Sequence, residues 1–504
     1  MPQSNNVLSF LKHILPYLFL LVLALLLRWQ TLGNPMVEVD EQFYLFAGGR
    51  LLGGDLPFVD VWDRKPFGLF LLYAFFHLFG SYRIWTYQIG ALLSLWGTAL
   101  LVRRMAATIA PAKGAFAAAA LYEIWPNLAG GEGGQSPIFY NFLTASAIAL
   151  LLTYLPHMVK SSTVRRNTGC AAMLLFGLAI QIKYTAIFEG YFVGLYLLCS
   201  SWKSRTSLRT IAHETALWVS AAILPTLSVF LFYWSIGHAT DWWYANITSI
   251  FHRGALPHKE TLFLILKILI IIAPLFFCWL LRTRLKIVFS NTQKNKIHFL
   301  DAWTGASLAG VAVFSPWYNH YALPVFVPLA VQAAPLWSNR IGRGVMLMVA
   351  AVGTLQGQLI LWKHQATKGN KTVFSELEQA IGSTGKGCFF IYDGPTLLYD
   401  TLPYCKLSTH QFPSHFYFQS EANATGMNPL SEIQSILAKK PDHIVTQEPA
   451  SPIENMVVRN ALYAALNRDY TPTYTWTRKH RSIVVYTRKA ALSPLPHPDA
   501  ALTR

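Results

Sequence analysis

The chain has 504 residues, of which 53% are hydrophobic and 13% are charged. Ordinary soluble domains carry about 25% charged residues, so this composition excludes a soluble multidomain enzyme, a disordered chain and a disulfide-rich scaffold. The 41 Lys and Arg residues exceed the 24 Asp and Glu residues, which gives a net charge of +17. The composition predicts a polytopic membrane protein with some mass outside the membrane.

Apolar runs recur along the chain, and a run of about 20 residues is enough to cross a bilayer as a helix. The first run ends at Arg28 and lacks a small-residue cleavage site, so we interpret it as a retained span and not as a signal peptide. We expect about eleven spans in a mostly α-helical bundle. The runs lie at 9–29, 84–102, 112–129, 136–157, 169–183, 185–201, 212–236, 260–281, 298–315, 320–337 and 343–362.

Basic residues gather in every second connection between these runs. Because such connections face the cytoplasm, the N-terminus is predicted inside, and everything after residue 363 is predicted outside. Much of the net charge then reflects topology, and no nucleic-acid partner is predicted. The basic connections are 103–104, 158–168, 201–211, 282–297 and 338–342, and none of them contains Asp or Glu.

The first outer loop, 32–67, is predicted to hold short helices at the membrane interface. Residues 42–52 have amphipathic helical spacing, and Gly53 and Gly54 end that segment. A second helix is expected at about 66–79. The acidic pair Asp40 and Glu41 stands directly before the first of these helices.

The chain changes character after 362, so we divide it into a membrane domain, 1–362, and an outer α/β domain, 363–489. Cys388 and Cys405 lie in that outer domain and are expected to pair if its compartment is oxidising. The Pro-, Ala- and His-rich end, 490–504, is expected to be disordered. Alternating elements predict the small domain: helices at 372–382, 428–439 and 455–467, and strands at 387–392, 442–447, 473–478 and 482–487.

The first outer loop carries the residues best suited to chemistry. A carboxylate at the mouth of a helix bundle, such as Asp40, can take a proton from a hydroxyl or amine nucleophile. Arg64 and Lys65 can bind a phosphate leaving group. The alternative is that Asp40 and Glu41 only stabilise the start of the following helix.

Three pieces of this loop follow one another in a characteristic order. They are the acidic pair Asp40-Glu41, then Gly54-Asp55-Leu56-Pro57-Phe58, then Trp62-Asp63-Arg64-Lys65-Pro66. In this order after the first span, they resemble the signature of the C-type glycosyltransferase superfamily. The resemblance is to the branch of protein O-mannosyltransferases, aminoarabinose transferases and rhizobial galacturonosyltransferases, and it covers roughly residues 10–340.

The resemblance implies an inverting enzyme of a bacterial inner membrane with a polyprenyl-phosphate sugar donor. The acceptor would be an envelope glycan such as lipopolysaccharide, a lipid or a protein. Asp40 would be the catalytic carboxylate, with Glu41 as the alternative. Arg64, Lys65 and Lys183 would hold the donor phosphate, with Asp63 beside them at the substrate.

Further candidates lie in three later segments, and each has a structural alternative. Lys183 stands between two short apolar runs and could instead extend to the interface. Relatives commonly carry a second substrate-binding acid near the start of the span that follows, and Glu132 stands slightly before that place, although its glycine-rich loop could simply be flexible. His320 could bind phosphate, and Tyr318 and Tyr321 could contact the sugar or belong to an interfacial aromatic belt.

No cofactor is required by this interpretation, although a divalent metal at the carboxylates is left open. The outer loops contain no HExxH or DxD motif. Two other functions compete with the transferase. One is a transporter or lipid flippase, which would place charges at the middle of the bilayer, and the other is a catalytically silent scaffold of an envelope complex.

Overall fold

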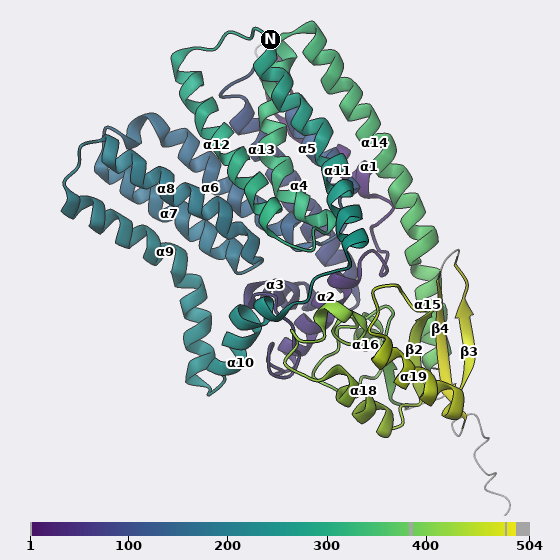
Figure 1. Cartoon of the computed structure of the whole chain (residues 1–504). Coiled ribbons are helices and arrows are strands. Elements are labelled where there is room, and N and C mark those ends of the chain that lie inside the picture. Colours follow the sequence, from purple (N-terminus) through teal and green to yellow (C-terminus); the bar gives the residue numbers. More distant parts are fainter. Residues whose placement is uncertain (1–2, 383–386, 479–480, 490–504) are drawn as a thin grey trace, which may run out of the picture.

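The computed structural model describes residues 3–382, 387–478 and 481–489, and the end predicted to be disordered, 490–504, lies outside these ranges. Helices form the chain as far as Lys368, and a small mixed sheet with its own helices follows (Figure 1). The mostly α-helical class with a small C-terminal α/β part is confirmed.

Each of the eleven predicted apolar runs forms a helix. Six described helical segments are long and apolar enough to cross a membrane, judged by length and composition, and the number of crossings stays a prediction. The eleven helices are α1 (Gln3–Arg28), α4 (Arg83–Ala106), α5 (Ala112–Ile124), α6 (Ser136–Met158), α7 (Ser162–Ile180), α8 (Ile187–Lys203), α9 (Leu208–Ser235), α11 (His258–Arg284), α12 (Asn291–Val313), α13 (Leu323–Ala333) and α14 (Arg340–Lys368).

The outer faces of these helices are apolar. Leu224 on α9, Leu266 on α11 and Leu355 on α14 are all exposed, together with many other large aliphatic and aromatic side chains. A soluble monomer rarely exposes contiguous apolar surface of this extent. Acyl chains can cover such faces, while the helices satisfy their own backbone hydrogen bonds.

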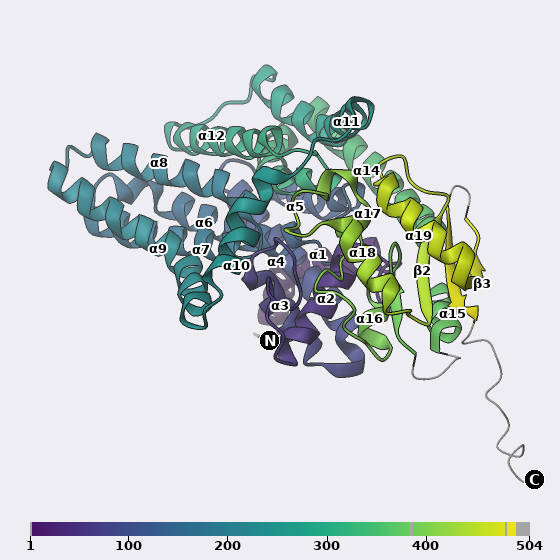
Figure 2. The ribbon, with the colours of Figure 1, turned by 60° about the horizontal axis from the view of Figure 1, so that its bottom comes forward.

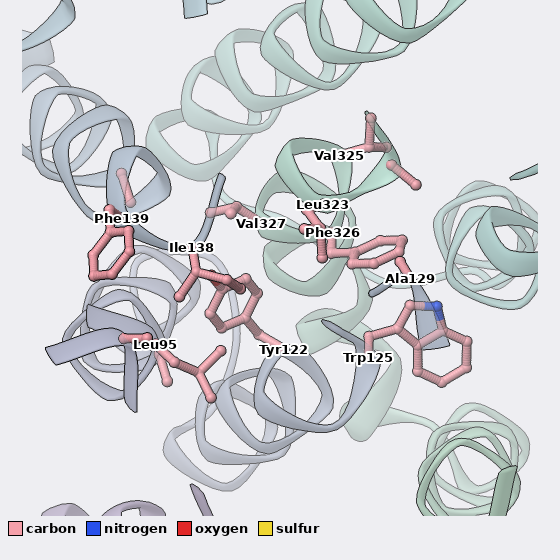
Figure 3. Packing of buried hydrophobic residues seen from close by; sticks show 14 of the residues in the cluster. Leu95, Tyr122, Trp125, Ala129, Ile138, Phe139, Leu323, Val325, Phe326 and Val327 are labelled. Atoms are coloured by element: carbon pink, nitrogen blue, oxygen red, sulfur yellow. The ribbon is translucent and has the colours of Figure 1, made fainter. Parts of the chain in front are cut away.

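Helix α13 lies at the centre of the bundle, and all eleven of its residues are buried. It packs against α4, α5, α11 and α12. Phe326 and Val327 of α13 lie near Tyr122 of α5 in the packed interior (Figure 3). This interior fixes the ends of the surrounding helices, and the connections between those ends carry several of the predicted site residues.

The two helices predicted in the first outer loop are α2 (Val39–Leu52) and α3 (Phe67–His77). They pack closely because Gly48 has no side chain: a Cβ atom there would lie 2.5 Å from the backbone nitrogen of Ala74. Helix α2 is more buried than an interfacial helix, since residues 41–48 are all buried. The amphipathic spacing predicted at 42–52 does not give α2 a solvent-exposed side along residues 41–48, because the C-terminal domain covers it. The ring centroids of Phe43 and Phe412 lie 4.9 Å apart.

The C-terminal sheet has the order β1-β2-β4-β3, in which β1 and β2 are parallel and the other neighbours are antiparallel. The predicted strands and helices of this domain are present. The strands are β1 (Phe389–Ile391), β2 (His443–Glu448), β3 (Tyr470–Trp476) and β4 (Ser482–Arg488), and the helices are α15 (Lys371–Gly382), α18 (Pro429–Ala438) and α19 (Met456–Asp469).

The two faces of this sheet belong to different cores, because strand side chains alternate between faces. Phe389 and Ile391 join the core that continues into the membrane helices. Phe390, between them, joins a separate core with Ile433 of α18 and Leu462 of α19. The sheet domain is therefore packed against the helical part. In both overall views it lies beside α2 and not at a distance on a linker (Figures 1 and 2).

A long connection, 392–428, links β1 to α18 and contains only the short helices α16 (Leu398–Thr401) and α17 (Ser414–Tyr417) and one 3-10 turn. Cys388 and Cys405 form a disulfide, which confirms the predicted pairing. The backbone N–H of Trp62 donates to the carbonyl of Thr409 at 2.8 Å. This connection therefore packs onto the first outer loop.

Candidate active site

A cavity of about 1030 Å³ lies where the first outer loop, two turns between membrane helices and the C-terminal domain meet. Helix α2, the turn between α7 and α8, and the turn before α13 all contribute to its lining. Eight of the ten predicted site residues line it: Asp40, Asp63, Arg64, Lys65, Lys183, Tyr318, His320 and Tyr321. Residues more than 270 positions apart in the sequence thus share one site.

Asp40 lies in the first turn of α2 and is half-buried at the cavity wall. The amide of Gln135 donates a hydrogen bond to Asp40 Oδ2 at 3.0 Å, which orients the carboxylate. Its position in the first turn also stabilises the helix, because the N-terminus of a helix carries partial positive charge. The stabilising role and the catalytic role are compatible, since one carboxylate oxygen can face the cavity.

Glu41, the alternative catalytic acid, is placed differently. It is 0% exposed and lies against the glycine-rich loop: a Cβ atom on Gly133 would meet its carboxylate at 2.2 Å. Burial raises the pKa of Glu41 to about 8. It is not among the residues that line the cavity, so the geometry favours Asp40 of the two.

Six lysine and arginine side chains line the cavity: Arg64, Lys65, Lys183, Arg253, Lys368 and Arg478. Lys183 is 8% exposed, and its ammonium lies 4.7 Å from the ring centroid of Tyr321. Among the described residues no carboxylate lies within ion-pair distance of Lys183. A buried cation without a partner carries a large desolvation cost, and an anionic ligand in the cavity would offset it.

Arg64 and Arg253 converge on one carboxylate of the C-terminal domain. Arg64 Nη2 lies 2.5 Å from Glu421 Oε2, and Arg253 Nε lies 2.7 Å from Glu421 Oε1. Burial alone would raise the pKa of Glu421, but the two guanidinium groups lower it below its usual value. The ion pairs hold Arg64 and Arg253 at the cavity and tie the sheet domain to the outer loops.

Asp63 is 2% exposed and lies 3.9 Å from the ammonium of Lys65. Burial raises its pKa, and Lys65 and Arg64 oppose that shift. The Lys65 ammonium also lies 5.4 Å from the ring centroid of Tyr44. Asp63 therefore constrains the position of Lys65 while facing the cavity itself.

The aromatic turn before α13 also faces the cavity. Tyr318 and His320 stack with their ring centroids 5.9 Å apart, and Tyr321 meets His320 edge to face at 4.8 Å. His320 and Tyr321 thus bring an imidazole and a phenol next to Lys183. The turn contributes to the site and not only to an interfacial belt.

Glu132 does not line the cavity but lies next to it, 2% exposed. Its carboxylate is 2.7 Å from Nδ1 of His364 and 3.9 Å from the ammonium of Lys368, which also binds Glu38. Ligand atoms of Glu38, Glu132 and His364 lie within 4.8 Å of one another, a spacing that could hold a metal ion. Lys368 already neutralises two of these acids, so the arrangement does not require a metal.

Sequence reasoning missed the part of the site that the C-terminal domain supplies. Asp393, His415, Glu421, Gln447 and Arg478 all line the cavity. Three of them lie in the connection 392–428, whose length was itself a signal, because loops longer than about 15 residues inside a compact domain are often functional.

Comparisons with known proteins give a fold but no sequence match: no family model and no curated protein matches the chain. The structure of ArnT from Cupriavidus metallidurans bound to undecaprenyl phosphate superposes with a TM-score of 0.59 and 16% identity, over 96% of this chain and 99% of that one. ArnT in the apo state gives 0.56 and 15%, over 98% and 100%.

The Archaeoglobus fulgidus oligosaccharyltransferase in the apo form gives a TM-score of 0.52 at 10% identity, over 87% of this chain and 70% of that one. Similarity at such low identity establishes the fold, and it agrees with the fold expected from the motifs of the first outer loop. The chain therefore has the fold that ArnT and the archaeal oligosaccharyltransferase share.

Proposed function

We propose that this protein is an integral membrane glycosyltransferase that moves a sugar from a polyprenyl-phosphate donor to an acceptor, with inversion at the anomeric carbon. The acceptor is an envelope glycan, lipid or protein on the outer face of a bacterial inner membrane. The fold supports this proposal, since one ArnT structure with the same fold holds undecaprenyl phosphate.

The observation that carries the proposal is that Asp40 and Lys183 line the same cavity. Lys183 is buried, faces that cavity, and has no carboxylate within ion-pair distance among the described residues. Arg64 and Lys65 add two further positive groups. A site with a general base and several cations suits a reaction in which a hydroxyl attacks and a phosphate leaves.

Each group then has one task in a single displacement. The acceptor oxygen forms a bond to the anomeric carbon as the bond from that carbon to the phosphate oxygen breaks. Asp40 takes the proton of the acceptor hydroxyl. The electron pair leaves with the polyprenyl phosphate, whose charge Lys183, Lys65 and Arg64 stabilise.

The polyprenyl tail would lie among the membrane helices while its phosphate reaches the turns that carry Lys183 and His320. The basic connections support a cytoplasmic N-terminus and an outer C-terminal domain. The disulfide between Cys388 and Cys405 supports an oxidising compartment for that domain.

The test is mass spectrometry of envelope lipids and glycans from a deletion strain carrying wild type, Asp40→Asn or a control. Asp469→Asn is a suitable control because the Asp469 side chain is 41% exposed, pairs only with its neighbour Arg468 among the described residues, and does not line the cavity. We expect the deletion and Asp40→Asn strains to lose one sugar from a glycan. In Asp40→Asn the transfer rate should fall about 100-fold or more, because the general base is lost.

A polyprenyl-phosphate sugar should accumulate in both strains, while Asp469→Asn restores the wild-type pattern. Full rescue by Asp40→Asn at equal protein level would contradict the assignment of Asp40. Substrate uptake by vesicles, with no change in any glycan, would favour a transporter instead.

A further inference from the structure

The C-terminal domain supplies a polar wall to the cavity that the proposed chemistry leaves unused. Asp393 follows β1, Gln447 lies in β2, and Arg478 follows β3, and all three line the cavity that contains Asp40. We refer to Asp393, Gln447 and Arg478 as the sheet-side wall. These residues come from separate segments, so only the folded sheet brings them together.

Hydrogen bonds join the three side chains into one array. Gln447 Nε2 donates to Asp393 Oδ1 at 2.8 Å, and Arg478 donates to Gln447 Oε1. Arg478 also donates to the carbonyl of Thr367 at 2.6 Å. A carboxylate oxygen, an amide and a guanidinium each have more hydrogen-bonding positions than these bonds use. The array can therefore bind further polar groups without losing its own bonds.

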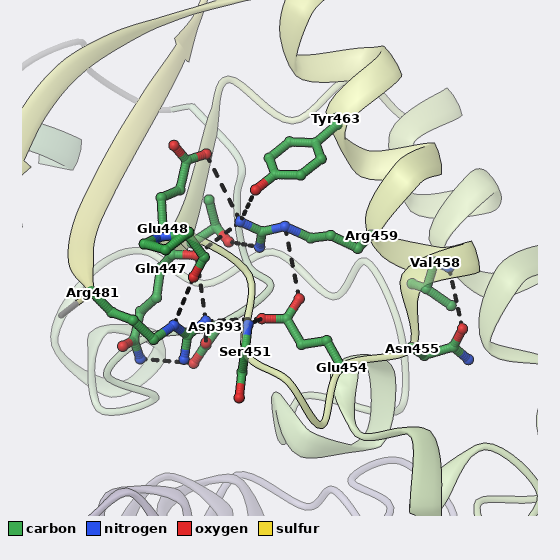
Figure 4. Close-up of polar contacts among 12 residues, drawn as sticks. Asp393, Gln447, Glu448, Ser451, Glu454, Asn455, Val458, Arg459, Tyr463 and Arg481 are labelled. Carbon is green, nitrogen blue, oxygen red and sulfur yellow. Dashed lines mark hydrogen bonds and ion pairs between the residues drawn. The ribbon is translucent and has the colours of Figure 1, made fainter.

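A second layer holds the wall in place (Figure 4). Arg481 donates to Asp393 Oδ2 at 2.9 Å and to Glu454 at 2.8 Å. Glu454 also lies 3.7 Å from Arg459, which is 0% exposed and donates to Thr446 and Tyr463. Asp393 is itself only 4% exposed. Side chains fixed in this way bind a ligand with little further loss of conformational entropy.

The sheet-side wall adjoins the catalytic end of α2. Thr396, three residues after Asp393, donates to the carbonyl of Val39 at 3.4 Å. Lys368, next to the Thr367 carbonyl that binds Arg478, donates to the carbonyl of Val37 at 3.4 Å. Asp40 therefore lies between this wall and the turns of the membrane helices that carry Lys183 and His320.

The cavity has a volume of about 1030 Å³, as large as the largest usual ligand sites, and its lining extends from Lys183 between the membrane helices to Gln447 in the sheet. The proposed reaction needs a donor and an acceptor in this space together. A lipid-linked donor is confined to the membrane side by its tail. The sheet side is then left for the acceptor, which also has to reach Asp40.

We propose that Asp393, Gln447 and Arg478 form the acceptor subsite, and that the acceptor group bound there is an uncharged, hydroxyl-rich carbohydrate. This inference rests on the proposed transferase function. Across the whole hydrogen-bonded network the charges balance, unlike those of the mainly basic group at Lys183: the acids are Asp393, Glu448 and Glu454, and the arginines are Arg459, Arg478 and Arg481. Planar polar groups with free donors and acceptors suit hydroxyls, and Phe412 and Tyr417 add aromatic surface to the same lining.

The test separates acceptor use from donor binding with Gln447→Ala and Asp393→Asn. Tyr463→Phe is the matched control, since Tyr463 belongs to the same hydrogen-bond network but does not line the cavity. Membranes containing each variant are titrated with the lipid and glycan extract of the deletion strain after the polyprenyl-phosphate sugar has been removed from it. That donor is then supplied at one saturating concentration. Binding of undecaprenyl phosphate and thermal unfolding are measured on the purified full-length protein.

We expect the apparent KM for the extract to rise about tenfold in Gln447→Ala and Asp393→Asn, because unpaired polar groups in a carbohydrate site weaken binding. Affinity for undecaprenyl phosphate should stay within about twofold of wild type, and Tyr463→Phe should match wild type in both assays. If the residues were purely structural, the variants would lose thermal stability, transfer activity and undecaprenyl phosphate binding together. That result would overturn the inference.

Other outcomes are equally decisive. An unchanged KM in either stably folded variant excludes the acceptor subsite, and weaker undecaprenyl phosphate binding would assign the wall to the donor. If the wild type neither binds undecaprenyl phosphate nor modifies the extract, the proposed function is wrong. The acceptor subsite, which rests on that function, is then wrong as well. If the wild type does both and the variants do not differ from it, only the acceptor subsite fails.

Discussion

Arg253 and Glu421 meet across the boundary between the membrane helices and the C-terminal domain, with Nε of the arginine 2.7 Å from Oε1 of the glutamate. The same carboxylate binds Arg64 of the first outer loop. The side of the cavity that carries Arg64 is thus completed by a residue that follows all the membrane helices in the sequence. The C-terminal domain is part of the candidate site.

Replacing Glu421 by Gln should destabilise the protein. The side chain is 5% exposed, and removing one partner of a buried ion pair leaves the other charges uncompensated, at a cost of about 3 kcal/mol. Thermal unfolding in detergent should show a melting temperature several degrees below wild type. Glu376→Gln is the control because Glu376 is exposed. An unchanged melting temperature for Glu421→Gln would show that the ion pairs of Glu421 with Arg64 and Arg253 do not contribute to stability.

Lys65→Met and Lys183→Met should each weaken binding of undecaprenyl phosphate. A charge-assisted contact to phosphate contributes about 1.5–3 kcal/mol, which corresponds to about a 10- to 100-fold loss of affinity. Binding to the purified protein can be measured by native mass spectrometry.

Lys113→Met is the matched control for the lysines, since Lys113 is exposed at the start of α5 and does not line the cavity. Equal affinities for wild type and both cavity variants would show that Lys65 and Lys183 do not bind the phosphate.

The disulfide predicts a definite pattern of thiol labelling. Of the five cysteines, only Cys170, Cys199 and Cys278 are free. Alkylation of unfolded protein should therefore label three thiols before reduction and five after it. Cys388→Ser should lower stability by about 3 kcal/mol, as expected for a crosslink spanning 17 residues. Five labelled thiols in unreduced protein would contradict a C-terminal domain in an oxidising compartment.

Asp393 predicts a pH dependence of stability. Burial raises its pKa to about 6, and Arg481 only partly offsets that shift. A carboxyl group whose pKa is higher in the folded state than in the unfolded chain favours folding at low pH. That contribution, about 3 kcal/mol at most, is lost as the pH rises through 6.

Asp393→Asn cannot ionise, so its melting temperature relative to wild type should rise by a few degrees between pH 4 and pH 7.5. The comparison needs only thermal unfolding of the two proteins across this range. A difference between them that stays constant with pH would show that Asp393 does not titrate near 6.

Hydropathy by itself determined the eleven apolar helices, and alternating patterns determined the strands of the sheet, because both signals repeat over short stretches of chain. The order of motifs from Asp40 to Pro66 also pointed to the fold. The choice between Asp40 and Glu41 did not follow from the sequence, since adjacent residues differ only in the direction their side chains take from α2.

Only the tertiary structure decided which residues surround Asp40. Glu421 and His415 lie in a connection without helical or strand periodicity, and Asp393, Gln447 and Arg478 depend on the order of strands in the sheet. The buried face of α2 likewise depends on Phe412, more than 360 residues away along the chain. Local patterns report which side chains prefer burial, whereas the partners that bury them are set by long-range packing.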